Sequence, residues 1–227
     1  MVDLSIILPV HNEEYIIRDV CSQVKKIIAS FTTSYEILLI ENGSTDQTLS
    51  VLKKIEKENT TVHSFIAPKG YGSAILKGIS KATGKYICYM PSDGQVDVSI
   101  LPILWKTAAT QSFDLVKVKR KSRESLSRTL TSWGLAFVLH LFFGTPFVDV
   151  NGSPRILLRK KLVALQLVSL DSFIDSEMLI KVKKCGWTIK EIPMKHLERL
   201  GGKSTRSINT YLEFVSNIFT YVRQKKY

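Results

Sequence analysis

The sequence predicts a single-domain α/β protein with a mostly parallel, Rossmann-like sheet and helices on both faces. Three observations lead to this fold class. Short apolar runs alternate with segments of helical periodicity through the first half of the chain. Polar loops follow these runs, as at the carboxyl edge of a parallel sheet. With 227 residues, 44% of them hydrophobic, the chain can bury one substantial core.

The apolar runs are expected to be strands, and they lie at residues 5–9, 36–40, 62–66, 85–90 and 113–119. Helical patterns lie between them at residues 13–30, 46–58, 72–82 and 99–110. In the second of these, Leu49, Leu52 and Ile55 recur every three residues. Buried strands joined by helices indicate right-handed crossovers and a parallel sheet covered on both faces.

The net charge of +12 favours an anionic partner, which includes phosphate-rich substrates, an acidic membrane surface and nucleic acid. We expect no nucleic-acid partner, since the chain has no aromatic RNA-binding motif, zinc finger or helix-turn-helix pattern.

The cellular compartment is expected to be reducing and cytoplasmic. Cys21, Cys88 and Cys185 are odd in number and widely spaced, which favours neither disulfides nor a zinc site. The first residues do not follow the signal-peptide pattern. The longest apolar stretch, residues 135–143, is too short to span a bilayer.

Four polar loops follow the first four strands, at residues 9–14, 41–46, 69–74 and 91–95. Each alone has a structural explanation: Ser44 or Thr45 as a helix cap, Gly70 and Gly72 as a tight turn, Asp93 as a turn residue. Together, on one edge of a sheet, they predict a binding site. Since Mg²⁺ and Mn²⁺ bind carboxylates and substrate phosphates, Asp93 is a candidate metal anchor for a nucleotide-linked substrate.

The motifs PVHNEE, ENGSTD, KGYGSAILKG, ATG and PSDGQ occur in this order. With them the chain resembles the inverting, family-two glycosyltransferases of the type A nucleotide-sugar fold. It is most similar to the branch that contains dolichyl-phosphate mannosyltransferase and other polyprenyl-phosphate glycosyltransferases. Later motifs at residues 149–155, 175–177 and 199–204 extend the resemblance over nearly the whole chain.

The resemblance implies a nucleotide diphosphate sugar as donor and Mg²⁺ or Mn²⁺ as cofactor, with Asp93 and Gln95 as metal ligands. The implied donor site comprises Pro9, Glu13, Glu41, Asn42, Gly70, Gly72, Ser92 and Asp93. Asn42 stands where the family usually has an aspartate, and Pro91 replaces the first acid of its D-x-D motif. The metal is then held mainly by Asp93 and the diphosphate, or another nucleotide is used.

For the acceptor, the resemblance implies a polyprenyl phosphate bound by basic side chains. The implied residues are Arg120, Arg128, Ser132 and Arg155, with a mobile acceptor loop that contains Arg199, Gly202, Lys203 and Ser204. Basic residues crowd positions 117–128, and a solvated surface is the alternative. That alternative is favoured for Lys117 and Arg123 and stays open for Arg120 and Arg128.

The implied reaction inverts the anomeric carbon, with a divalent cation and basic groups stabilising the leaving diphosphate and with Asp93 as a catalytic residue that anchors the cation. A phosphate acceptor needs no general base. A sugar hydroxyl does, and Asp175 or Glu177 is then the catalytic candidate; both could instead be helix N-terminal acids.

We expect a catalytic domain at residues 1–204 and an amphipathic helix at 205–227 that either packs on the domain or binds an anionic membrane surface from the cytoplasmic face. Three functions remain: a polyprenyl-phosphate glycosyltransferase, a transferase that extends a saccharide, and a weakened nucleotide- or lipid-phosphate-binding module. The sequence does not indicate an oligomeric state.

Overall fold

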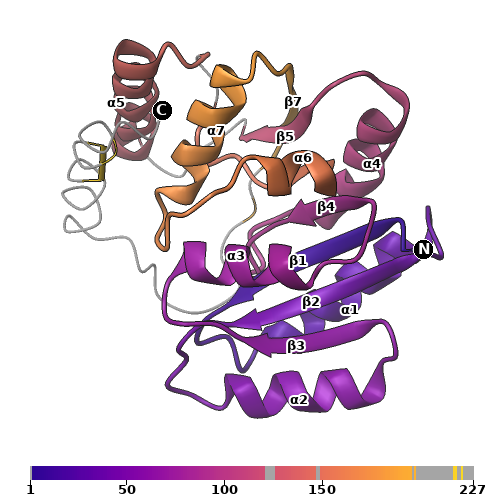
Figure 1. Cartoon of the computed structure of the whole chain (residues 1–227). Helices are drawn as coiled ribbons and strands as arrows, with labels where there is room; N and C mark the ends of the chain where they lie inside the picture. The colour runs from indigo at the N-terminus through magenta and orange to yellow at the C-terminus, as the bar shows by residue number, and fades with distance from the viewer. Residues whose placement is uncertain are drawn as a thin grey trace.

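The computed structural model describes residues 2–120, 126–146, 149–195, 197, 217–218 and 221, with only the backbone at 126–133 and 135. One seven-stranded sheet runs through the described part, with helices on both faces (Figure 1). The strands are β1 (Leu4–Val10), β2 (Tyr35–Glu41), β3 (Val62–Ile66), β4 (Tyr86–Tyr89), β5 (Leu115–Arg120), β6 (Arg155–Leu158) and β7 (Ile189–Met194).

The strand order is β3-β2-β1-β4-β6-β5-β7. β1 pairs in parallel with β2 and β4, β2 with β3, and β5 with β7. β6 alone among these strands runs antiparallel to both of its neighbours, β4 and β5. It therefore joins two parallel groups into one sheet.

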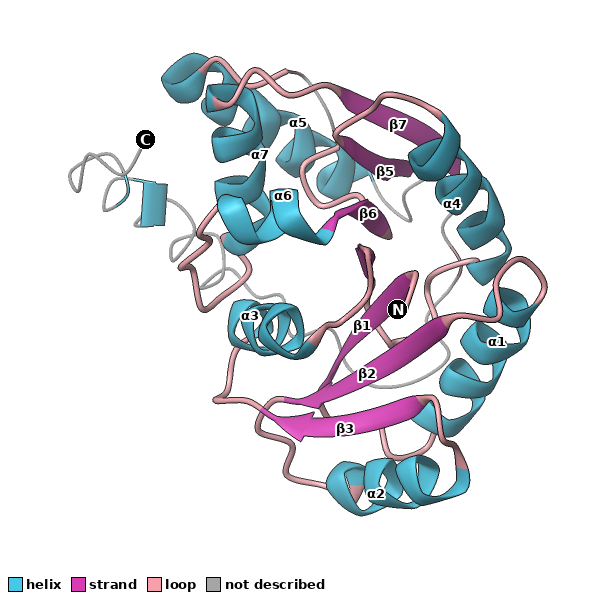
Figure 2. Ribbon diagram, turned by 45° about the vertical axis from the view of Figure 1, so that its right-hand side comes forward, coloured by secondary structure: helices cyan, strands magenta, loops and turns pink. Residues whose placement is uncertain are grey.

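The helices are α1 (Ile17–Ala29), α2 (Thr48–Glu58), α3 (Tyr71–Lys81), α4 (Leu101–Thr110), α5 (Leu126–Phe143), α6 (Arg159–Ala164) and α7 (Ile174–Lys184), with the 3₁₀ turn η1 (Val98–Ile100) before α4. α1, α2 and α4 cover one face of the sheet, and α3, α6 and α7 cover the other (Figure 2). Strand side chains alternate between the two cores: Ile6 and Leu8 pack on the α1 side, while Ile7 packs on the α3 side. Both faces of the sheet are thus buried.

The predicted fold class is confirmed, and the five predicted strands correspond to β1–β5 within a few residues. Two features differ from prediction. The antiparallel β6 was not predicted from the sequence, and α1 begins at Ile17 instead of Glu13. The amides of Asn12 and Glu14 donate to side chains of the loop after β2, and that of Glu13 donates to Thr48 at the start of α2. Asn12 also has a φ of 54°, so this stretch is a loop.

In the described part of the chain, no helix is both long enough and apolar enough to cross a bilayer. Most of the expected C-terminal helix lies outside the described residues. Of those that are described, Ile218 and Tyr221 are buried, and the Tyr221 ring lies 6.0 Å from that of Phe143 and 5.7 Å from that of Phe173. At these positions the chain packs on the domain.

Candidate active site

The order in which strands are added to the sheet reverses between β1 and β4. From β1 the chain adds β2 and β3 on one side, then crosses to place β4 on the other side. In open α/β sheets, ligands bind outside the carboxyl ends of the strands at such a point. Ser92 joins the two loops there: its Oγ lies 2.5 Å from the Pro9 carbonyl oxygen and also contacts the Glu13 carboxylate. The structure therefore brings Pro9, Glu13 and Ser92 together.

The loops after β1 and β2 are bound to each other through side chains. The Asn12 amide donates to Ser44 Oγ at 3.0 Å, and the Thr45 amide donates to Asn12 Oδ1 at 2.8 Å. The Gln47 amide donates to Glu14 Oε2 at 2.9 Å. These bonds give the carboxyl edge of β1 and β2 a defined shape, because they satisfy amides that would otherwise need water.

Two buried polar atoms on this edge have no hydrogen-bond partner in the described structure: Asn42 Oδ1 and His11 Nδ1. Asn42 directly follows β2, and its Nδ2 donates to the Gly70 carbonyl at 3.2 Å, which orients the amide. Its neighbour Glu41 is also buried and accepts from the Ser44 amide. Buried polar atoms without a partner are costly, so these atoms suit a polar ligand. The sequence analysis did not select His11.

Gly70 and Gly72 are required by packing within the protein. Gly70 has a φ of 135°, and a Cβ there would lie 2.4 Å from the Leu170 carbonyl oxygen. A Cβ on Gly72 would lie 2.3 Å from the Ser169 carbonyl oxygen. The start of α3 is thereby packed against the segment before α7. This contact explains both glycines, and their role in donor binding remains a prediction.

Asp93 lies in the loop after β4, at the same edge as Ser92. Its Oδ1 accepts from the Gln95 amide at 3.2 Å, and Gly94 between them has a φ of 76°. The Leu197 amide donates to the Gln95 carbonyl at 3.1 Å, so the segment after β7 returns to this loop.

The donor set of this loop fits a magnesium or manganese ion that is shared with substrate phosphates. Within the described residues, no cluster of three or more His, Cys, Asp or Glu side chains could hold a metal alone. Asp93 offers a carboxylate and Gln95 an amide oxygen, both hard ligands. Mg²⁺ usually binds proteins through one or two carboxylates and takes its other ligands from water and phosphates.

Asp175 is part of a buried polar group under the N-terminus of α7. Its Oδ1 lies 3.1 Å from Arg155 Nη1 and accepts from the Tyr89 hydroxyl at 3.1 Å. The fully buried Arg155 also donates to the Gly152 carbonyl at 3.0 Å and the Val150 carbonyl at 2.5 Å. Burial, with the charge of Asp175, raises the pKa of Tyr89 well above its usual value. Asp175 and Arg155 are therefore bound to each other.

Glu177 is fully buried, and its carboxylate binds groups of the protein. It accepts from the Val168 amide at 3.1 Å and the Ser169 amide at 2.8 Å, and it forms an ion pair with Lys181 at 2.7 Å. These contacts hold the segment against which Gly70 and Gly72 pack. They account for Glu177 without a catalytic role.

Arg120 is bound to Asp149 along one edge of its guanidinium. Its Nε and Nη2 donate to the two carboxylate oxygens at 2.8 and 2.6 Å. Burial opposes ionisation of Asp149, but the hydrogen bonds and charge of Arg120, with the charge of Lys117, hold its pKa well below the usual range.

The prediction that Lys117 is a solvated surface residue is wrong. Its side chain projects from β5 and is fully buried. The ammonium donates to the Asp149 carbonyl and lies 3.3 Å from Glu191 Oε1, and these contacts make its burial possible. Burial, together with the charge of Arg155, lowers the pKa of Lys117 to about 8.

Seven of the residues singled out from the sequence lie where the structure describes no side chain. They are Arg123, Arg128, Ser132, Arg199, Gly202, Lys203 and Ser204.

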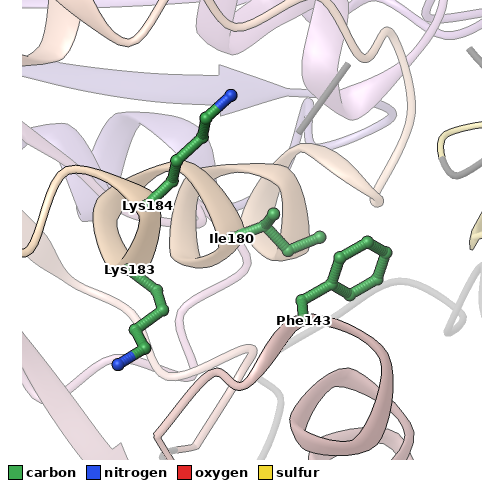
Figure 3. Close-up of a pocket in the computed structure, with 4 residues that line it drawn as sticks. All are labelled: Phe143, Ile180, Lys183 and Lys184. Atoms are coloured by element: carbon green, nitrogen blue, oxygen red, sulfur yellow. The ribbon is translucent and has the colours of Figure 1, made fainter. Parts of the chain in front are cut away.

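A separate cavity of about 330 Å³ lies between the end of α5 and the end of α7, lined by Phe143, Ile180, Lys183 and Lys184 (Figure 3). Because α7 leads into β7, which is parallel to β5, this end of α7 lies at the amino edge of the sheet. The cavity is therefore remote from the Asp93 loop.

The comparisons with known proteins agree with this geometry. The family described as "Glycosyl transferase family 2" matches residues 5–157. Uncharacterized glycosyltransferases of Mycobacterium bovis and Mycobacterium tuberculosis are 27% identical over 210 residues, 88% of this chain and of theirs.

Among solved structures, glucosyl-3-phosphoglycerate synthase of M. tuberculosis is similar in fold. Its complex with Mn²⁺, uridine diphosphate and phosphoglyceric acid superposes with a TM-score of 0.73 at 17% identity. The match covers 99% of this chain and 78% of that one. Its complex with Mn²⁺ and uridine-diphosphate-glucose gives a TM-score of 0.71, also at 17% identity, over 97% of this chain and 78% of that one.

Proposed function

The chain belongs to glycosyl transferase family 2 and is a glycosyltransferase, and we propose that it transfers a sugar, with inversion, from a nucleotide diphosphate sugar to a polyprenyl phosphate or a related anionic acceptor. The observation that carries this proposal is the contact between the loops after β1 and β4, at the point where the strand order reverses. Asp93 follows Ser92 directly in that crevice, where donor phosphates and a cation would bind.

The donor's diphosphate would be bound through Mg²⁺ or Mn²⁺ held by Asp93 and Gln95. The cation would neutralise the charge that develops on the leaving diphosphate. Support comes from the hard oxygen ligands of this loop and from the Mn²⁺ in the complexes of the similar mycobacterial synthase. Because Pro91 supplies no carboxylate, the affinity for the cation should depend strongly on bound donor.

The nucleoside would lie at the edge of β1 and β2. Asn42 Oδ1 is a buried acceptor without a partner in the described structure, and it suits an N–H group of a base. His11 Nδ1, in the neighbouring loop, is a second buried polar atom without a partner in the described structure, and it donates or accepts according to its tautomer. Two such atoms so close to the reversal of strand order favour a polar ligand.

A phosphate acceptor is favoured over a sugar hydroxyl. A hydroxyl acceptor requires a general base, whereas a phosphate is already ionised near neutral pH. The two candidate bases, Asp175 and Glu177, are buried and bound to Arg155 and Lys181, respectively. Arg120, bound to Asp149 by one edge, still has the N–H groups of its other edge for a phosphate.

Attachment of the protein to a lipid surface is favoured by exposed side chains of α5, near the edge of the sheet opposite the Asp93 loop. Phe137, Leu141 and Phe142 are each at least half exposed there, at 56%, 66% and 50%. Lys183 and Lys184 lie beside the end of the same helix (Figure 3). Exposed apolar side chains next to cations suit a bilayer with anionic headgroups. The chain's net charge of +12 acts in the same direction.

The proposal is tested with purified protein, Mn²⁺ and a panel of uridine and guanosine diphosphate sugars. Each donor is offered with a short-chain polyprenyl phosphate, with phosphoglyceric acid, or with a saccharide. We expect transfer to the prenyl phosphate and loss of transfer on chelation of the metal. Transfer to phosphoglyceric acid alone, the compound bound in the similar synthase, would place the chain with small-molecule acceptors. Donor binding without turnover would indicate a binding module.

A further inference from the structure

A row of polar side chains crosses the second half of the sheet on the α7 side. Tyr89 of β4 pairs with Arg155 of β6, Arg155 pairs with Lys117 of β5, and Lys117 pairs with Glu191 of β7. Residues paired across strands project from the same face, so the four side chains form one line. Arg155 and Lys117 are fully buried, and Tyr89 is equally inaccessible.

The two buried cations of this row bind main-chain carbonyls of the turn before β6. Arg155 donates to the carbonyls of Val150 and Gly152, and Lys117 donates to the carbonyl of Asp149. A Cβ on Gly152 would lie 2.0 Å from the Val118 carbonyl oxygen, so only glycine fits there. Burying two cations is costly, and here their charge is used to fix one short turn.

Asp149 is the residue of this turn that is held most completely. Its amide donates to Glu191 Oε1 at 2.8 Å, and its carbonyl accepts from Lys117. Its carboxylate accepts from Arg120 three times: from the main-chain amide at 3.1 Å, from Nε at 2.8 Å and from Nη2 at 2.6 Å. A carboxylate fixed in this way determines the direction of the Arg120 guanidinium.

We propose that Asp149 is a positioning residue, which presents the free edge of Arg120 to an anionic acceptor, and that Lys117 and Glu191 hold it in place for this purpose. The inference rests on the proposed function for the identity of the acceptor, because the outer edge of a guanidinium binds phosphate and carboxylate alike in bidentate fashion. Without Asp149, Arg120 could still reach the acceptor, but its side chain would populate many rotamers. Few of these rotamers would hold the acceptor in the geometry that the reaction requires.

The first test is a double-mutant cycle of Arg120→Ala and Asp149→Asn. Each single variant should raise the acceptor KM about tenfold, the scale of one charge-assisted contact, with donor affinity within twofold of wild type. The double variant should be no worse than Arg120→Ala, since a positioning residue has no effect once its target is gone. Losses that multiply, or equal losses in donor binding, would overturn the proposal.

The second test does not depend on turnover, and its first readout does not depend on the acceptor. The Nε–H signal of Arg120 in ¹⁵N-arginine NMR spectra, assigned by its loss in Arg120→Lys, should be protected from solvent exchange in wild type and exchange fast in Asp149→Asn. Dimethylallyl phosphate should shift this signal in wild type only. An unchanged signal in Asp149→Asn would refute positioning even if the proposed acceptor were wrong. A wild type that leaves dimethylallyl phosphate unbound would count against the proposed acceptor instead.

Asp114→Asn is the matched control. Asp114 is also an ion-paired, partly buried acid, bonded to Lys161, but it precedes β5 at the amino edge of the sheet. Its substitution should leave the acceptor KM and the Arg120 signal unchanged. If it raised the acceptor KM as much as Asp149→Asn, a general loss of stability would explain both.

Discussion

The two halves of the sheet use charge differently. In β1–β3 and their helices, the buried carboxylates of Glu36 and Glu41 accept hydrogen bonds from hydroxyl and amide groups, and further polar side chains bind amides in the loops at the carboxyl edge. In the second half, Lys117, Arg155, Asp175 and Glu177 are buried as ion pairs or on main-chain groups. This difference predicts that substitutions in the first-half loops reduce catalysis, whereas substitutions of the buried charges reduce stability, with an additional loss of acceptor binding where they hold Asp149.

The largest expected effect is on stability. Glu177→Ala should lower the free energy of unfolding by about 2–5 kcal/mol, because it leaves the buried amides of Val168 and Ser169 without their acceptor and removes the ion-pair partner of Lys181. Urea denaturation measures this. Glu58→Ala, which removes the exposed ion pair with Arg18 in the first half, should have a much smaller effect, because solvent screens that pair. If Glu177→Ala abolished turnover while keeping wild-type stability, Glu177 would be a base after all.

The second effect concerns catalysis in the first half. Asp93→Asn should lower kcat/KM at least about 100-fold, the scale for losing one preorganised electrostatic contact, with an unchanged urea midpoint. Steady-state kinetics across a Mn²⁺ titration measures it. Asp97→Asn is the control in the same loop, since Asp97 only caps η1 through the Ser99 amide. Normal turnover of Asp93→Asn at limiting Mn²⁺ would remove Asp93 from the metal site.

A third effect is the pH dependence of stability in the second half. The pKa of Lys117 is about 8 in the folded protein, against 10.5 ordinarily. Between these values the unfolded chain binds more protons, so the contribution of Lys117 to stability rises with pH, by up to about 1.4 kcal/mol per unit. Below pH 8 the penalty for burying the ammonium is fully present.

The difference in unfolding free energy between wild type and Lys117→Met, measured from pH 7 to pH 10, isolates this contribution from other titrating groups. The unfolding free energy of wild type should rise relative to that of the variant as the pH rises above 8. A difference that is constant over this range would mean that Lys117 keeps an ordinary pKa in the folded protein.

The contrast between the halves also explains what the sequence could predict. Strands such as β1 are continuous apolar runs, and the loops that follow them are recognisable by their polar residues, so the fold class, β1–β5 and the Asp93 loop could be predicted. β6 begins with a buried arginine, and Lys117 lies inside β5. The periodicity of apolar residues predicts that such charged residues are exposed. It contains no information on their partners Asp175 and Glu191, which are far away in the chain and allow them to be buried.

The candidate site could be predicted only in part for the same reason. Local patterns identified Asp93, and the family resemblance implied Asn42, but neither showed that Asn42 Oδ1 is buried without a partner in the described structure. The sequence left Asp175 and Glu177 as bases or helix N-terminal acids, and only contacts with Arg155 and Lys181 provide a third explanation. Long-range partners decide such roles.

The smallest expected effect compares lysines at the surface of the two halves. Lys183→Gln, beside the exposed apolar side chains at the end of α5, should weaken binding to vesicles of mixed neutral and anionic phospholipid about fivefold, since one cation near an anionic surface contributes about 1 kcal/mol. Lys57→Gln, on α2 in the first half, makes the same change of charge elsewhere and should have no effect. Co-sedimentation at two salt concentrations measures both. The difference between the variants should shrink at high salt, because screening weakens the interaction. Equal weakening by both substitutions would mean that net charge, and not an oriented surface on α5 and α7, determines binding.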